Sequence, residues 1–84
     1  MTNADLQYVD GRQVQFELYA RTVFRLAHSL ALVDDSEANK GHMLIDMLAE
    51  SVTGIENIAV SMANGAVVFV KADLPRLGTV TVTL

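Results

Sequence analysis

The two histidines are the side chains in this sequence best suited to move a proton near neutral pH. His28 follows Arg25 by three residues, on the polar side of a predicted helix. A general base needs an orienting carboxylate and a substrate pocket, and the sequence indicates neither for His28. We therefore interpret His28 as an exposed or helix-capping residue, because the dipole at a helix C-terminus favours a protonated imidazole.

His42 begins a row of candidate metal ligands, with Asp46 and Glu50 following at four-residue spacing. On a helix this spacing places one imidazole and two carboxylates on the same side. Zinc sites use three or four ligands in which nitrogen or sulfur dominates, and this chain has no cysteine. The segment 34–37 carries carboxylates but lacks the spacing and the glycine of a calcium loop. We therefore predict no metal and no other cofactor, and interpret the row as a solvated helix face.

No motif for covalent catalysis or for phosphate binding is present. The serines stand outside any Gly-x-Ser-x-Gly sequence, and the five glycines are scattered singly. The sequence therefore argues against most enzymes and predicts no catalytic residue. A small-ligand binding protein or a minor enzyme stays open as an alternative. Its pocket would lie between helices and sheet or at a dimer interface, with these polar candidates: Tyr19, Arg25, His28 and His42.

The charge balance argues against nucleic acid as a partner. Ten acidic and six basic side chains give a formal charge of −4, which repels phosphate backbones at long range. Arg12, Arg21 and Arg25 could form a short basic patch that binds a phosphate or an acidic protein surface, although solvation is the simpler interpretation. A separate hypothesis is that the chain is an acidic inhibitor or regulator that occupies a basic site on its partner.

The sequence predicts a cytoplasmic protein that does not bind membranes. The N-terminal residues carry no basic group followed by an apolar run, so they do not resemble a secretion signal. The longest uninterrupted apolar run, Ala66–Val70, is far too short to cross a bilayer. The absence of cysteine fits a reducing compartment.

An amphipathic helix over residues 16–33 is the element on which the other elements are expected to pack. At 100° per residue its apolar side chains occupy one arc about 180° wide, which requires a broad cover such as a sheet. Asp10 and Gln13 fit a capping box that extends this helix back to about Gly11. The alternative is an N-terminal β-hairpin, because Leu6, Tyr8 and the apolar residues of 14–18 alternate around Asp10-Gly11.

A second helix is predicted from Glu37 to about Val52, with Asp35 or Ser36 as its N-cap and the Gly54 region as its end. The short connection implies that the two helices are antiparallel neighbours. Met43 and Met47 fall outside the inward stripe and form a second, smaller apolar patch, suited either to core packing or to an interface. The inward stripe consists of Ala38, Gly41, Leu44, Ile45, Leu48, Ala49 and Val52.

After Gly54 the period of the apolar residues changes to two, and Asn64-Gly65 predicts a hairpin between residues 55–62 and 66–71. A two-residue turn pairs Ala63 with Ala66. One face, expected to take the helices, then carries Ile58, Val60, Met62, Val67 and Phe69. The opposite, small and apolar face carries Ala59, Ser61, Ala63, Ala66, Val68 and Val70.

Residues 79–84 predict a third strand, with valines on one side and threonines on the other. The predicted fold is therefore a single α+β domain over residues 1–84, with two antiparallel helices on one face of a three-stranded antiparallel β-meander. Its order is ααβββ, or ββααβββ with the N-terminal hairpin. The third strand has no lysine to discourage pairing, so its open edge is a candidate for contact with a second copy.

The leading functional hypothesis is a small protein-interaction module that forms a homodimer and binds through apolar surface on the second helix and the sheet. Its basis is composition, because 51% hydrophobic residues exceeds what a domain of 84 residues readily buries. A second copy, or another protein, would cover the remainder. The candidate interface residues are Met43, Met47, Ala59, Ser61, Val68, Val70, Val80 and Val82.

Overall fold

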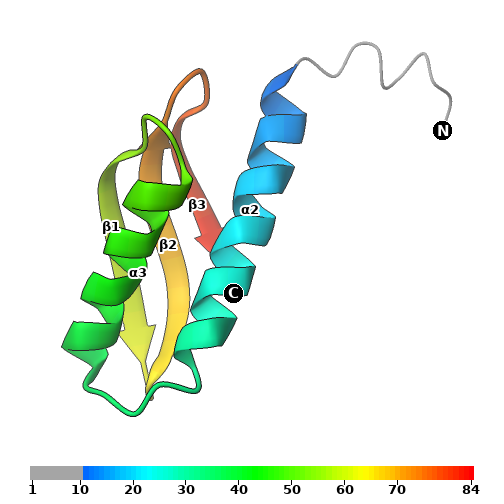
Figure 1. The fold of residues 1–84 in the computed structure, drawn as a ribbon. Helices are drawn as coiled ribbons and strands as arrows, with labels where there is room; N and C mark the ends of the chain where they lie inside the picture. The colour runs from blue at the N-terminus through cyan, green and yellow to red at the C-terminus, as the bar shows by residue number, and fades with distance from the viewer. Residues whose placement is uncertain (1–10) are drawn as a thin grey trace, which may run out of the picture.

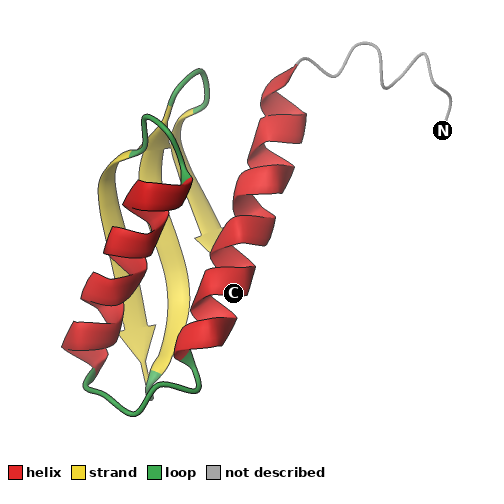
Figure 2. Ribbon diagram, viewed as in Figure 1, coloured by secondary structure: helices red, strands yellow, loops and turns green. Residues whose placement is uncertain are grey.

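The computed structural model describes residues 11–84, which form a helical layer packed on one face of a β-sheet (Figure 1). The helices are α2 (Gly11–Leu30) and α3 (Glu37–Ser51). The strands β1 (Glu56–Ala63), β2 (Ala66–Leu74) and β3 (Gly78–Thr83) form an antiparallel sheet in the order β1-β2-β3 (Figure 2). This architecture confirms the predicted ααβββ fold.

Helix α2 begins at Gly11, so the long-helix interpretation is confirmed. The N-terminal hairpin is wrong, because residues 12–18, which were to supply its second strand, are helical. Leu6, Tyr8 and the predicted cap residue Asp10 lie outside the described residues. The helix ends at Leu30, three residues before the predicted end, and a tighter turn follows in which the Val33 amide donates to the Leu30 carbonyl at 3.0 Å.

The start of α3 is capped as its sequence indicates. The Ser36 hydroxyl accepts a hydrogen bond from the Asn39 amide at 3.2 Å. The Asp35 carboxylate accepts from the Asn39 side chain at 2.8 Å and from the Ser36 amide at 2.7 Å. These bonds, that of Asn39 first, lower the pKa of Asp35, with a smaller contribution from Lys40. The helix therefore starts at the residue that the cap predicts, Glu37.

The inward face of α3 is rotated relative to the prediction. Leu44 and Leu48 are fully buried as expected, but Ala38 and Ala49 are exposed. In their place Lys40, at 8% exposure, completes the buried row, because its aliphatic stem can pack while its ammonium reaches outward. The Lys40 ammonium lies 3.5 Å from the Gly65 carbonyl in the β1–β2 turn.

A β-bulge in β2 changes which side chains of the hairpin meet the helices. The predicted pairs Ala63–Ala66 and Met62–Val67 are present, but the register then shifts, so that Ser61 lies opposite Phe69. The extra residue of β2 reverses the alternation beyond it. The predicted faces are therefore wrong for two side chains: Val70 is buried under the helices and Phe69 lies on the outer face.

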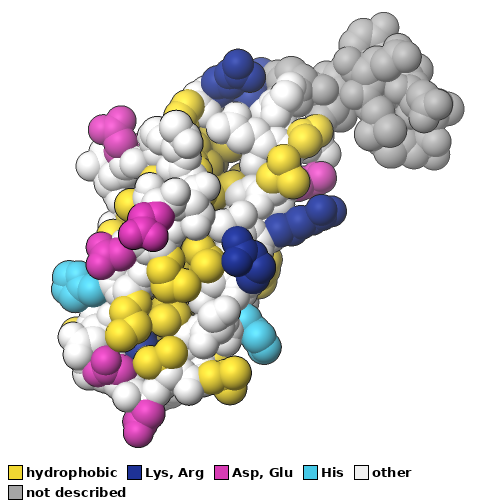
Figure 3. Space-filling view, viewed as in Figure 1, with side chains coloured by type: hydrophobic (Ala, Val, Ile, Leu, Met, Phe, Trp, Pro, Cys, Tyr) yellow, Lys and Arg dark blue, Asp and Glu magenta, His cyan; other side chains and the backbone are white. Residues whose placement is uncertain are grey.

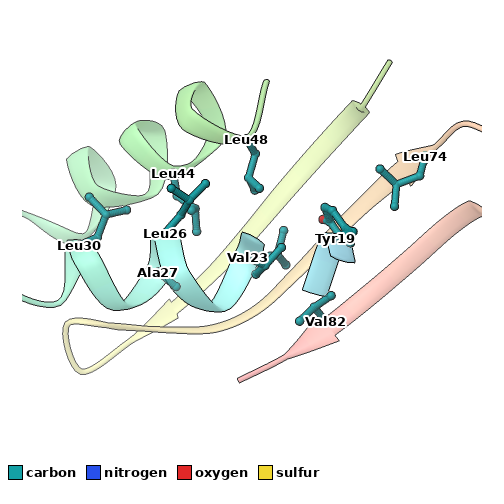
Figure 4. Close-up of a cluster of buried hydrophobic side chains, with 10 residues drawn as sticks. Tyr19, Val23, Leu26, Ala27, Leu30, Leu44, Leu48, Leu74 and Val82 are labelled. Atoms are coloured by element: carbon teal, nitrogen blue, oxygen red, sulfur yellow. The ribbon is translucent and has the colours of Figure 1, made fainter. Parts of the chain in front are cut away.

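The core fills the space between the helical layer and the sheet. Figure 4 shows its side chains pointing into this space from α2, α3, β2 and β3. The side chains beneath the helices and along the centre of β2 are buried. The core residues are Tyr19, Val23, Leu26, Ala27 and Leu30 of α2, Leu44 and Leu48 of α3, Val70 and Leu74 of β2, and Val82 of β3. Neither helix within residues 11–84 is long and apolar enough to cross a membrane.

Candidate functional site

The two histidines lie in separate surface grooves. His28 is exposed at the rim of a groove of about 190 Å³ between the C-terminal half of α2 and the sheet, which Phe24, Lys40 and Leu84 also line. His42 is exposed on the far side of α3, in a shallow groove beside β1. The structure therefore does not bring the two imidazoles into one site. Within residues 11–84, no three histidines or acids lie close enough together to hold a metal ion.

A third groove is lined by Tyr19, whose hydroxyl is a buried polar group without a hydrogen-bond partner among the described residues. This groove, about 290 Å³ in volume, lies between α2 and the end of α3, and Leu18, Thr22 and Val52 also line it. The Tyr19 side chain is buried, and its hydroxyl has no hydrogen-bond partner within the described part of the chain. Burial raises the pKa of this phenol above its ordinary value.

The outer face of the sheet is more polar than the sequence predicts. Ala59 and Ser61 lie there as expected, but beyond the bulge Phe69, Lys71 and Asp73 take the outward positions of β2 in place of Val70. The Asp73 carboxylate accepts hydrogen bonds from the Asn57 side chain, at 2.8 Å, and from the Thr79 hydroxyl. These two bonds, Asn57 first, lower the pKa of Asp73, and the nearby Lys71 adds to the effect.

The predicted interface residues divide into surface and core. Val70 and Val82 belong to the core, at 0% and 4% exposure, so their side chains cannot meet a partner. Val80 is partly buried and packs against the core. Ala59 and Val68 are exposed, and Ser61 is half-buried. The sheet therefore keeps Val68, Phe69 and Leu84 as its large exposed apolar side chains, and two of the valines predicted for an interface are in the core.

Met43 and Met47 are partly buried and pack against the core from the side of α3 that faces away from β1. Their remaining surface lies on the helical side of the molecule. Figure 3 shows hydrophobic side chains gathered over the seam between α3 and α2, with acidic groups over α3 and both basic and acidic groups over α2. The methionines therefore contribute to core packing, one of the two roles that the sequence left open, and part of their surface remains accessible, so the interface role stays a prediction.

We use the term helical face for the outward surface of both helices. On α2, four exposed side chains fall within an arc of about 60°, opposite the buried residues. On α3, the two methionines lie next to two exposed acids. The helical face consists of Val14, Leu18, Arg21 and Arg25 of α2 and of Met43, Asp46, Met47 and Glu50 of α3.

Sequence reasoning found the parts of the helical face separately. It assigned Arg21 and Arg25 to a basic patch and the methionines to an apolar patch, and it placed Asp46 and Glu50 in a row with His42. It did not join them, because their arrangement depends on which flanks of the two helices turn away from the sheet. The rotation of α3 that buries Lys40 determines this arrangement.

Comparison of the chain with protein-family models, with curated proteins and with solved structures found no match.

Proposed function

We propose that this chain is a small protein-interaction module whose first partner is a second copy of itself. The helical face supplies the contact, and the sheet supports the two helices from behind. An obligate or stable homodimer buries apolar surface that a lone subunit leaves in water. The function follows from this assembly, not from chemistry on a substrate.

The observation that carries the proposal is the exposure of large apolar side chains on α2. Leu18 and Val14 are 55% and 52% exposed, one turn apart on the same side of the helix. Leu18 lines a groove with Val52 at the C-terminal end of α3, so this row borders the end of the helix pair. Single exposed apolar residues are common, whereas two in a row on the side of the molecule that also carries the partly exposed Met43 and Met47 support a contact surface.

Light scattering coupled to size-exclusion chromatography, over a dilution series, tests the proposal. We expect a species of twice the chain mass of 9.1 kDa at high concentration, and dissociation as the protein is diluted. A mass of 9.1 kDa at every concentration would contradict self-association. The variant Leu18→Ser should shift the midpoint of dissociation to higher concentration, while Thr81→Ser, on the outer sheet face, should leave it unchanged.

A ligand-binding function is a second candidate, favoured by the groove that Lys40 and His28 line. Its walls are apolar, from Phe24, Leu84 and neighbouring side chains, and its polar side chains are the basic residues Lys40 and His28. A small carboxylate with an apolar body fits this combination. A thermal-shift screen of such acids should raise the unfolding midpoint if the groove binds them, and Lys40→Met should abolish that rise.

A further inference from the structure

We infer that two copies join through their helical faces about a two-fold axis parallel to the helices, so that α2 of each copy lies opposite α3 of the other. This inference rests on the proposed function and specifies the geometry of the same surface. The result is a four-helix layer enclosed by two sheets, with the methionine-lined seams facing one another.

Opposite charges predominate on the two helices, although α2 also carries the exposed Glu17 one turn before Arg21. On the helical face α2 carries Arg21 and Arg25, whereas α3 carries Asp46 and Glu50. All four side chains are exposed, and no ion pair within residues 11–84 engages any of them. Such a surface is complementary to a copy of itself when the basic helix of one meets the acidic helix of the other.

The heights of the charges along the helices match as well. Leu30 of α2 and Lys40 of α3 line one groove, so the last two turns of α2 lie beside the start of α3 in this antiparallel pair. Arg25 lies five residues from Leu30, and Asp46 lies six residues from Lys40. Arg21 lies nine residues from Leu30, and Glu50 lies ten residues from Lys40, so this pair also differs by one residue. At the rise of an α-helix, each arginine is then level with its acid to within about one helical turn, roughly 5 Å.

A two-fold axis in the plane of the contact can run parallel or perpendicular to the helices. Only one of these two axes places the arginines opposite the acids at their level. A two-fold axis parallel to the helices keeps every residue at its height and exchanges the positions of α2 and α3. Arg25 then lies opposite Asp46 of the second copy, and Arg21 opposite Glu50. A two-fold axis perpendicular to the helices would place α2 opposite α2, with arginine against arginine. Charge complementarity therefore selects the parallel axis.

Apolar groups complete the contact between the charged rows. Met43 and Met47 of both copies meet along the axis, and their flexible thioethers adapt to the facing seam. Leu18 and Val14 extend the apolar surface toward the N-terminal end of α2. The ion pairs thereby flank a dry centre, the arrangement in which exposed charges set register and apolar side chains supply most of the affinity.

Two charge-reversal variants test the pairing directly. The first is Arg21→Glu with Arg25→Glu, which makes both helices of the face acidic. The second is Asp46→Arg with Glu50→Arg, which makes both helices basic. Each variant alone should weaken the homodimer at least about tenfold in Kd, as measured by sedimentation equilibrium at low salt. An equimolar mixture should form a one-to-one heterodimer, because every facing pair is then opposite in charge.

A matched control separates the helical face from net charge. Each exchange of a cation for glutamate subtracts two from the formal charge of −4, so the first variant has a charge of −8. Lys71→Glu with Arg76→Glu reaches the same −8 with exposed residues of β2 and of the turn that follows it. This control should dimerise like wild type. Far-ultraviolet circular dichroism verifies that each variant is folded.

Three results would overturn the inferred geometry. The first is an unchanged Kd in both charge-reversal variants, and the second is a mixture that stays monomeric. The third is loss of the dimer in Thr81→Pro while the charge reversals have no effect, which would place the contact at the β3 edge. These results contradict the geometry and leave self-association intact, whereas a wild type that is monomeric at every concentration contradicts the proposed function itself.

Cross-linking provides a measurement that does not depend on the charge variants. Because the chain has no cysteine, Met43→Cys introduces a single reactive thiol on the helical face. A short bis-maleimide should link two copies of this variant and should not link two copies of Thr81→Cys. Cross-linking of Thr81→Cys alone would overturn the geometry.

Discussion

Tyr19 shows how much a single buried atom can matter in so small a core. Its ring packs beneath α2 against β2 and β3, yet its hydroxyl has no partner within residues 11–84. Removing a hydroxyl from water without a hydrogen bond costs about 1 to 3 kcal/mol. The apolar arc of α2 predicts the burial of Tyr19, but the sequence alone cannot indicate where a hydroxyl at the end of a ring finds its partner.

Replacing Tyr19 with phenylalanine should therefore stabilise the domain. We expect Tyr19→Phe to raise the free energy of unfolding by about 0.5 to 1.5 kcal/mol, since the ring packing is kept and the desolvated hydroxyl is removed. Urea denaturation at neutral pH measures the change. A loss of more than about 1 kcal/mol would show that the hydroxyl makes a stabilising bond.

Asp73 predicts a dependence of stability on acid. Hydrogen bonds from Asn57 and Thr79 lower the pKa of Asp73 in the folded state, so its ionised form contributes stability at pH values above its ordinary pKa. This contribution is lost as the pH falls through the lowered pKa. Asp73→Asn should be less stable than wild type at neutral pH, and the difference should narrow toward pH ~2.5.

Urea denaturation across this pH range measures the effect, with Asp34→Asn as a control that removes one exposed carboxylate from a loop. A difference between wild type and Asp73→Asn that stays constant down to the lowest pH would contradict the role of the two hydrogen bonds.

The sequence predicts the elements better than it predicts their rotation. Caps at Ser36 and the turn at Asn64-Gly65 identify the start of α3 and the hairpin, because each depends on local chemistry. The β2 bulge has no comparable local signal, and one extra residue places Val70 inside and Phe69 outside. The rotation of α3 was also missed, because a lysine stem can pack as well as an alanine.

The passage from α3 to β1 depends on the absence of a side chain at Gly54. Its φ of 81° is strained for other residues, and an added Cβ would lie 2.7 Å from the Cγ of Pro75, against which this turn packs. Gly65 has a similar φ of 78°, but an added Cβ there would meet nothing within 4 Å. Substitutions at the two glycines therefore distinguish the cost of backbone strain from the cost of a steric clash.

Gly65→Ala should cost about 1 kcal/mol, from strain alone. Gly54→Ala should cost about 2 to 4 kcal/mol, because the clash with Pro75 adds to the strain. Urea denaturation of the two variants checks the order, and Gly54→Ala,Pro75→Ala should recover part of the loss. Equal costs at the two positions would contradict the packing of Pro75 against Gly54.

At the scale of the whole molecule, the domain has one layer of helices and one sheet, so each layer has a side that faces away from the core. The outer side of the sheet carries threonines, Lys71 and the hydrogen-bonded Asp73, with Phe69 as a partly exposed apolar side chain among them. The helical face instead combines methionines, exposed Leu18 and Val14, and two opposite rows of charge (Figure 3). This difference is the reason why we propose the helical face as the surface for self-association.

The methionine methyl groups report on this surface most directly. Met43 and Met47 lie on the helical face, whereas Met62 lies on β1 beneath α3, with its Cγ 4.0 Å from where a Cβ of Gly41 would stand. In a nuclear magnetic resonance dilution series of protein labelled at the methionine methyls, the signals of Met43 and Met47 should shift with concentration while that of Met62 stays in place. Concentration-independent signals for Met43 and Met47 in a protein that dimerises would contradict association through the helical face.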